Sequence, residues 1–163
     1  DIIEKKKNKF KCFIANDNSN GQIVLSGTKN NIEKLSIYLN SINIKNIKLS
    51  VSAPFHCELM RAATELMKNE LAKIDFKDFQ TSLISNVTAK EIDDSSLIRD
   101  LLVRQIESRV RWRESINYMI KNGVNNFIEI GPGKVLSGLV KRIDKKVKVS
   151  AINNEEDINK IEI

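Results

Sequence analysis

Residues 126–143 read NFIEIGPGKVLSGLVKRI, and this segment carries the clearest information about the fold class. A short apolar run leads into the turn Gly131-Pro132-Gly133, after which apolar residues recur at helical spacing to about Ile143. A second apolar run follows at Val147–Ile152. The order strand, helix, strand predicts two parallel strands joined by a crossover helix.

The segments before and after this unit continue the alternation of helices and strands. A stripe of apolar residues from Cys57 to Ile74 predicts a helix, and Asp94 or Ser95 can cap another. The remaining predicted elements are a strand at Ser82–Val87, helices at Leu97–Ile106 and Trp112–Ile120, and a short helix at Glu155–Ile161. We therefore expect residues 51–163 to form an α/β unit with a largely parallel sheet.

The first fifty residues follow a different pattern, in which two predicted strands come before any helix. Phe10–Ala15 and Gln22–Leu25 flank a turn-rich segment at residues 16–21. Thr28 can cap the helix that follows, and Ile44–Val51 is predicted to be a further strand. Residues 1–50 are therefore expected to form part of a small α+β subdomain.

The composition is that of a globular protein of one domain's size. Of the 163 residues, 41% are hydrophobic and 29% are charged. No apolar run reaches the length of a membrane span, and the sequence does not open with a signal-peptide pattern. Because the first residue is Asp1 rather than Met, we expect a processed product or a fragment.

The two cysteines, Cys12 and Cys57, lie in unrelated contexts and fit no paired metal-ligand spacing, so no metal site is expected. A reduced cytoplasmic or organellar-matrix setting is the preferred interpretation, although two cysteines leave a disulfide open.

The net charge of +6 raises the question of a nucleic-acid partner. The lysines are scattered and are not interleaved with aromatic residues of the kind that stack on bases. A solvated basic surface is therefore preferred, and an acidic protein is the favoured partner for that charge. We expect neither a nucleic-acid partner nor a membrane.

Two further motifs are better explained by structure than by chemistry. Gly131-Pro132-Gly133-Lys134 lacks both the earlier glycine and the following Ser or Thr of a phosphate-binding loop, so a tight turn is preferred. Backbone amides at the start of the next helix are still able to face a site. Arg109, Arg111 and Arg113 flank Trp112, which is predicted to be a core residue rather than a stacking surface.

His56, the only histidine, follows a predicted strand and Pro54 and precedes a predicted helix. Loops in that position hold catalytic groups in α/β enzymes, and an imidazole is a suitable general base. A nucleophile is missing from the pattern, because the sequence contains no Gly-x-Ser-x-Gly elbow. Cys57 is adjacent in sequence, so its side chain is expected to diverge from that of His56. On these residues alone, a structural and a catalytic histidine both stay open.

Seven blocks of sequence occur in an order that can be compared with known families. They are IANDN at 14–18, GQIVLSG at 21–27, SAPFHCELM at 52–60, ISNV at 84–87, IRDLLVRQ at 98–105, VRW at 110–112 and FIEIGPGKVLSGL at 127–139. Together they closely resemble the C-terminal half of the malonyl-CoA:acyl carrier protein transacylases, over nearly the whole chain. The resemblance implies part of a ferredoxin-like small subdomain at residues 1–50. It also implies the C-terminal part of a hydrolase-like α/β acyltransferase subdomain at residues 51–163.

The function that this resemblance implies is malonyl transfer from malonyl-CoA to the phosphopantetheine thiol of acyl carrier protein, in fatty acid biosynthesis. His56 matches the family's general base and acid, and Gln105 matches the residue whose backbone carbonyl orients that imidazole. Asn16 and Asn18 match a family loop that faces the substrate cleft. Malonyl-CoA and phosphopantetheinylated acyl carrier protein are then the substrates, and no bound cofactor is implied.

The same resemblance implies that other catalytic groups lie upstream of Asp1. These are a nucleophilic serine in a Gly-His-Ser-x-Gly elbow, an oxyanion-hole glutamine and the arginine that pairs with the malonyl carboxylate. The expected partners are acyl carrier protein and the missing N-terminal half of the enzyme, and the isolated chain is expected to be inactive. The alternative is a non-catalytic fragment, or half of a split enzyme, that binds its missing half or acyl carrier protein.

Overall fold

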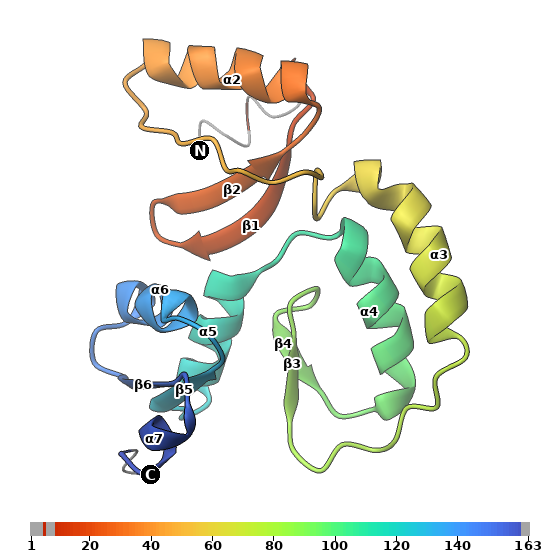
Figure 1. Ribbon diagram of the computed structural model, residues 1–163, viewed down its shortest axis with the longest axis vertical. Coiled ribbons are helices and arrows are strands. Elements are labelled where there is room, and N and C mark those ends of the chain that lie inside the picture. Colours follow the sequence, from red (N-terminus) through yellow and green to blue (C-terminus); the bar gives the residue numbers. More distant parts are fainter. Residues whose placement is uncertain (1–4, 6–8, 161–163) are drawn as a thin grey trace.

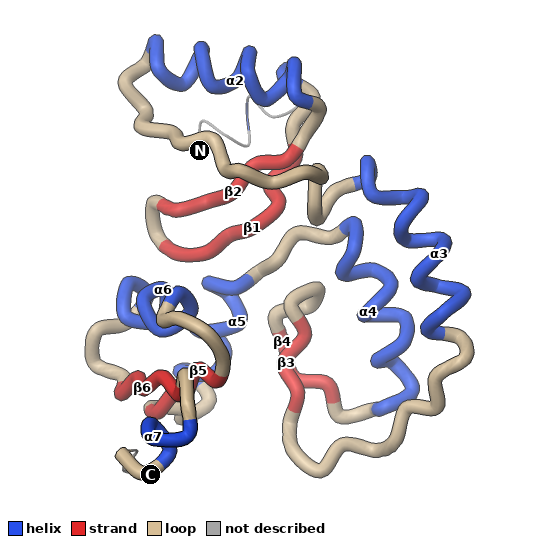
Figure 2. The backbone as a smooth tube through the Cα atoms, in the orientation of Figure 1, coloured by secondary structure: helices blue, strands red, loops and turns tan. Residues whose placement is uncertain are grey.

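The computed structural model describes residue 5 and residues 9–160, whose elements fall into three groups. A hairpin with one helix forms the first group, and a pair of helices with a second hairpin forms the second. The third group holds the remaining helices and a parallel pair of strands. Figures 1 and 2 show the three groups in different parts of the molecule, joined by irregular segments.

The first group is an antiparallel hairpin packed against a helix. β1 (Phe13–Ser19) pairs with β2 (Gln22–Ser26), and the tight turn between them uses Gly21, whose φ is 77°. In α2 (Lys29–Ser41), the Asn31 amide donates to the Thr28 hydroxyl, so the predicted cap is confirmed. The core of this group consists of Cys12, Leu35 and Leu39.

The first strand begins and ends later than the predicted Phe10–Ala15, and its turn is shorter than the sequence predicts. Residues 16–19 continue β1 instead of forming a turn. They do so because backbone groups of this segment find partners on both sides. One side pairs with β2, and on the other the Asp17 amide donates to the Val110 carbonyl at 2.9 Å while the Val110 amide donates to Ala15 at 2.8 Å. These hydrogen bonds outweigh the low strand propensity of asparagine and aspartate.

The predicted strand at Ile44–Val51 is wrong. This stretch is irregular, and its apolar residues Ile47 and Val51 are 75% and 62% exposed. Apolar and polar residues alternate here as in a strand, but no strand of the described chain pairs with the segment. A strand is stable only when its backbone groups meet a neighbouring edge, which a local pattern does not supply.

The second group contains two helices that run side by side in opposite directions (Figure 1). Its elements are the 3₁₀ turn η1 (Glu58–Met60), α3 (Arg61–Leu71), the hairpin of β3 (Leu83–Ser85) and β4 (Lys90–Ile92), the 3₁₀ turn η2 (Ser95–Leu97) and α4 (Ile98–Glu107). Arg99 donates to the carbonyls of Leu71 and Ile74, which lie at and just beyond the end of α3. Of the two predicted caps, Asp94 accepts a hydrogen bond from the Ser96 amide.

The third group contains the parallel pair predicted from residues 126–143. β5 (Asn126–Ile130) lies parallel to β6 (Lys148–Ile152), and α6 (Val135–Ile143) connects them. α5 (Trp112–Lys121) precedes this unit and α7 (Glu155–Ile158) follows it, whereas the predicted end of the last helix, Ile161, lies outside the described residues. Trp112 packs against the core formed by Ile116, Val140 and Val147, as expected of a core residue.

The expectation of a largely parallel sheet needs correction. Within the described residues, β5–β6 is parallel, while β1–β2 and β3–β4 are antiparallel. β3 and β4 are joined by a short turn at residues 86–89, and a connection of that length permits only antiparallel pairing. The fold is a mixed α/β fold. Among the described helices, none has the length and apolar content needed to cross a bilayer.

Candidate active site

His56 lies at the end of the irregular segment that connects α2 to the lead-in of α3. Its φ is 60°, a left-handed conformation that is uncommon for residues with a Cβ. Two contacts hold the flanking backbone: the Ser26 hydroxyl donates to the Phe55 carbonyl at 2.7 Å, and the Cys57 thiol donates to the Pro54 carbonyl at 3.1 Å. Backbone strain retained by surrounding contacts is a common property of functional loops.

The half-buried imidazole of His56 faces the C-terminal end of α4. Its Nδ1 lies 3.1 Å from the backbone carbonyl oxygen of Gln105. Because a carbonyl only accepts, Nδ1 carries the hydrogen in this contact and Nε2 keeps a free lone pair. The Gln105 carbonyl is available because α4 ends at Glu107, and carbonyls of a last helical turn have no partner within the helix.

The side chain of Gln105 has a separate function at this helix end. Its Nε2 donates to the Ser108 carbonyl at 3.2 Å, while the Ser108 amide donates to the Arg104 carbonyl at 2.9 Å. These bonds terminate α4 and leave the Gln105 carbonyl to His56. The arrangement is therefore suited to a general base that takes up a proton at Nε2.

Cys57 does not supply a nucleophile to this base. Its side chain is 2% exposed, and its thiol contacts the Pro54 carbonyl while the imidazole contacts Gln105. Burial raises the pKa of the Cys57 thiol, and the amide of Leu59 opposes that shift only in part. A buried thiol that resists ionisation is a weak nucleophile.

The clustered arginines form ion pairs that connect the three groups of elements. Arg113 donates to both carboxylate oxygens of Asp17 at 2.9 and 2.7 Å, which links α5 to β1. Arg111 pairs with Glu114 and also donates to two carbonyls of the β3–β4 turn. Its hydrogen bond lowers the pKa of the Glu114 carboxyl. Arg109 contacts the same carboxylate at 3.3 Å. The cluster therefore has a structural role at the junction of β1, α5 and the β3–β4 turn.

The remaining predicted residues, Asn16 and Asn18, lie in β1 and not in a loop, and both are half-buried. Asn16 forms a parallel bridge to Val110, three residues beyond the end of α4. Their part in substrate binding stays a prediction.

The amides at the start of α6 are occupied by protein groups. The Leu136 and Ser137 amides donate to the Glu129 carboxylate at 3.1 and 2.7 Å, and the Gly133 amide donates to the Asn153 side chain at 2.6 Å. Hydrogen bonds from Ser137 and from neighbouring backbone amides lower the pKa of the Glu129 carboxyl. This turn therefore has its own carboxylate as a cap and does not need an external anion.

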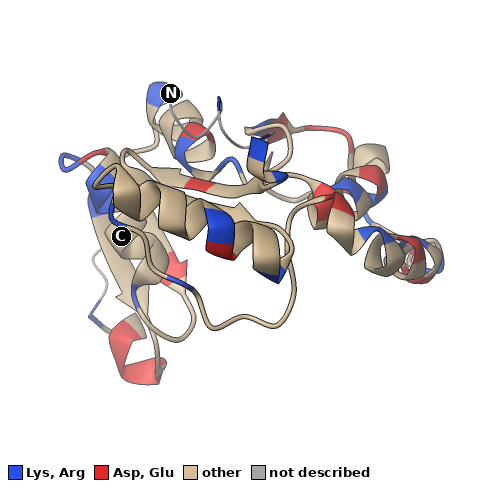
Figure 3. Ribbon diagram, turned by 90° about the horizontal axis from the view of Figure 1, so that it is seen from above, with Lys and Arg blue, Asp and Glu red and all other residues tan. Residues whose placement is uncertain are grey.

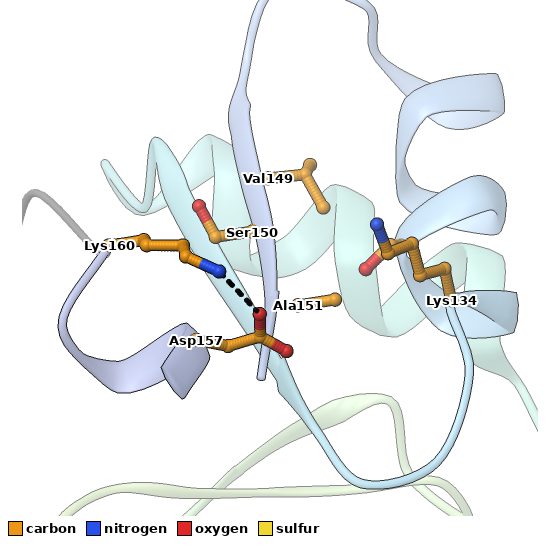
Figure 4. Close-up of a pocket in the computed structure, with 7 residues that line it drawn as sticks. Lys134, Val149, Ser150, Ala151, Asp157 and Lys160 are labelled. Atoms are coloured by element: carbon orange, nitrogen blue, oxygen red, sulfur yellow. Dashed lines mark ion pairs between the residues drawn. The ribbon is translucent and has the colours of Figure 1, made fainter. Parts of the chain in front are cut away.

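A shallow hollow of about 290 Å³ lies along β6 and α7, away from the elements that hold His56. Figure 4 shows Lys134 and Lys160 on opposite sides of β6, with Lys160 paired to Asp157 at 3.9 Å. None of its lining residues belongs to the His56 loop or to α4. The described part of the chain contains no cluster of three or more His, Cys, Asp or Glu side chains able to hold a metal ion.

Basic and acidic residues are interspersed along several elements (Figure 3). In Figure 3, Lys and Arg share helices with Asp and Glu. Lys73 just past the end of α3 pairs with Glu70 at 2.7 Å, and Arg104 on α4 pairs with Asp100 at 3.3 Å. This distribution differs from the continuous basic stripe of a typical nucleic-acid-binding protein.

Sequence reasoning missed Ser26 and Glu129, which hold the His56 loop and the start of α6. The sequence around Ser26, Leu25-Ser26-Gly27, lacks the first glycine of a nucleophile elbow and therefore gives no catalytic signal. No local signal connects Ser26 with Phe55, because the two residues are far apart in sequence and meet only through the fold. For Glu129, a usable signal was its position shortly before the start of α6, since carboxylates favour helix N-termini.

Comparison with known proteins gives consistent results. The chain is 46% identical over 146 residues to the malonyl CoA-acyl carrier protein transacylase of Bacillus subtilis, covering 89% of this chain and 46% of that protein. It is 41% identical over 140 residues to the Escherichia coli protein of the same name, covering 85% of this chain and 45% of the relative. The chain therefore spans about half the length of the curated relatives it matches. No protein-family model matches it.

Solved structures agree with this result. The crystal structure of an acyl-carrier-protein S-malonyltransferase from Bartonella henselae superposes with a TM-score of 0.92 at 40% identity, covering 98% of this chain and 52% of that one. A complex of a type II PKS acyl-carrier protein with its malonyl-transacylase also matches, with a TM-score of 0.88 at 33% identity over 96% of this chain and 51% of that one. By sequence and by fold, the chain belongs to the malonyl-CoA:acyl carrier protein transacylase family, of whose members it spans about half.

Proposed function

We propose that the protein containing this chain transfers a malonyl group from malonyl-CoA to the phosphopantetheine thiol of acyl carrier protein, with His56 as its general base and acid. The observation that carries the proposal is the contact between His56 Nδ1 and the Gln105 carbonyl, because it leaves Nε2 free. Membership of the transacylase family supplies the reaction class. The proposed place of action is the cytoplasm or an organellar matrix.

In the first half-reaction, His56 Nε2 takes the proton of a serine hydroxyl as the serine oxygen attacks the malonyl thioester. The carbon–sulfur bond then breaks, and the imidazolium returns the proton to the departing coenzyme A thiolate. In the second half-reaction, Nε2 takes the proton of the phosphopantetheine thiol, whose sulfur attacks the malonyl-serine ester. The serine leaves and recovers its proton from His56.

In this scheme, the Gln105 carbonyl replaces the carboxylate of a Ser-His-Asp triad. It fixes the ring orientation and the tautomer in each half-reaction. The 163 residues contain no Gly-x-Ser-x-Gly elbow, so the proposed nucleophile comes from outside them.

The test is intact-mass spectrometry of the natural gene product and of the 163-residue chain, each with and without malonyl-CoA. We expect the natural gene product to gain the mass of one malonyl group, and the 163-residue chain to gain none because it lacks the elbow. A stable malonyl adduct on the 163-residue chain, or no adduct on a natural product that carries the elbow, contradicts the proposal.

A second candidate function is binding without catalysis. It is favoured by exposed apolar side chains near the carboxyl end of β5, where Ile130 and Val135 are 79% and 71% exposed. In this case the chain binds a complementary polypeptide or acyl carrier protein. A natural gene product that forms no adduct but co-purifies with a serine-bearing partner supports this alternative.

A further inference from the structure

The end of β2 and the His56 loop meet through one hydrogen bond. Ser26, the last residue of β2, is buried, with 9% of its surface exposed. Its hydroxyl donates at 2.7 Å to the carbonyl of Phe55, the residue before His56. This bond connects the first group of elements to the loop that holds the only histidine.

The position of the accepted carbonyl gives this bond its significance. The Phe55 carbonyl and the His56 amide belong to the same planar peptide unit, so holding the oxygen fixes the plane from which His56 projects. His56 then rotates into a left-handed conformation with φ of 60°, which a residue with a Cβ avoids unless its surroundings impose it.

The imidazole is held from the opposite direction by α4. Nδ1 donates to the Gln105 carbonyl at 3.1 Å. Ser26 therefore holds the backbone of His56, and Gln105 holds its ring. If the Phe55–His56 peptide plane rotated freely, the direction of the His56 Cα–Cβ bond would change. The ring would then move away from the end of α4. The Cys57 thiol, which donates to the Pro54 carbonyl, is a weaker donor than the Ser26 hydroxyl. The carbonyl that it holds also lies one residue farther along the chain from His56.

We propose that Ser26 is a positioning residue for His56, which holds the Phe55–His56 peptide so that Nδ1 meets Gln105 and Nε2 stays free. The catalytic consequence of this role rests on the proposed function, whereas the positioning itself does not. The two are therefore tested separately.

Positioning is measured by long-range ¹H–¹⁵N NMR of the natural gene product at pH 8.5, in which comparison with the His56→Asn variant identifies the imidazole signals of His56. We expect the wild-type chain to show the Nδ1–H tautomer. Ser26→Ala should lose that preference, and Ser26→Thr should keep it because the hydroxyl remains. The matched control is Ser41→Ala, which removes a bond of the same kind and length, from Ser41 to the Tyr38 carbonyl at 2.7 Å in α2. A Ser26→Ala spectrum identical to that of the wild type overturns the proposal.

If Ser26→Ala does not fold, Ser26→Cys replaces it, since a thiol keeps a side chain of similar shape with a weaker donor. A graded loss of the Nδ1–H tautomer from Thr to Cys supports the proposal, and equal tautomers in the two variants overturn it.

The catalytic consequence is measured as malonyl transfer by the natural gene product. We expect Ser26→Ala to lower kcat roughly tenfold with little change in KM, because a small misplacement of the base affects the reacting geometry more than substrate binding. Ser26→Thr should restore the rate. If the tautomer shifts but transfer by the wild type is absent, the positioning stands and the proposed function fails. If the tautomer does not shift and wild-type transfer is normal, the positioning fails alone.

Discussion

The left-handed backbone of His56 determines which substitution best tests its role. Asparagine tolerates φ near 60° better than most residues, so His56→Asn removes the imidazole with less backbone strain than His56→Ala. We expect His56→Asn to lower malonyl transfer by at least about a thousandfold, as losses in nucleophile–base pairs do. The measurement is kcat/KM of the natural gene product, with the melting temperature as the control for folding. Near-normal turnover removes His56 from the mechanism.

Gln105 provides a contrasting test, because its proposed contribution comes from the backbone. Gln105→Ala removes the side-chain bond to the Ser108 carbonyl and leaves the carbonyl that faces His56. We expect transfer to fall by less than about tenfold, since one such hydrogen bond is worth roughly 1 kcal/mol. The measurement is the steady-state rate of malonyl transfer by Gln105→Ala, compared with that of His56→Asn under the same conditions. A loss as large as that of His56→Asn shows that the side chain, not the carbonyl, matters.

At the scale of elements, ion pairs hold α5 against its neighbours, so the free energy of unfolding depends on pH. The hydrogen bond from Arg111 lowers the pKa of Glu114 below its ordinary value of 4.5. A carboxyl with a depressed pKa in the folded state binds fewer protons than in the unfolded state between the two pKa values. The stability that the Arg111–Glu114 pair contributes is therefore fully present above pH 4.5, and it is lost as the pH falls through the folded-state pKa of Glu114.

We expect the melting temperature of the chain to fall as the pH is lowered from 6 to 3, and Glu114→Gln to reduce that fall. The variant should also melt lower at pH 6, because Arg111 loses its charged partner. Glu65→Gln, an exposed glutamate on α3, is the matched control and should follow the wild type. The prediction is wrong if Glu114→Gln and Glu65→Gln show the same pH dependence.

At the scale of the whole molecule, apolar surface near the carboxyl end of β5 favours association. Ile130 and Val135 are 79% and 71% exposed, and within the described residues β5 pairs on one edge only, with β6. An open strand edge beside exposed apolar side chains readily binds another chain. We expect the 163-residue chain to associate as its concentration rises.

Light scattering after size-exclusion chromatography measures this association. The double variant Ile130→Lys with Val135→Lys should reduce it, whereas Ile37→Lys should not, because Ile37 is equally exposed, at 71%, but lies on α2. A wild-type chain that stays monomeric at every concentration contradicts the prediction.

Local sequence determined most of the elements of this protein. The apolar spacing of residues 126–152 predicts β5, α6 and β6 closely, and Thr28 marks the start of α2. Periodicity and caps suffice here because each depends on residues a few positions apart. The resemblance of short blocks to one family singled out His56 and Gln105, although no spacing between them explains why they meet.

Tertiary structure alone decided which backbone edges pair and which distant groups touch. Residues 16–19 became a strand because Val110 and β2 lie beside them. Residues 44–51 did not, because no strand of the described residues lies beside them. The bonds from Ser26 to Phe55, from His56 to Gln105 and from Arg113 to Asp17 join positions that only the folded chain brings together. A local pattern limits the secondary structures that a segment can form. Long-range packing selects among them, because it determines whether the backbone groups of the segment have hydrogen-bond partners.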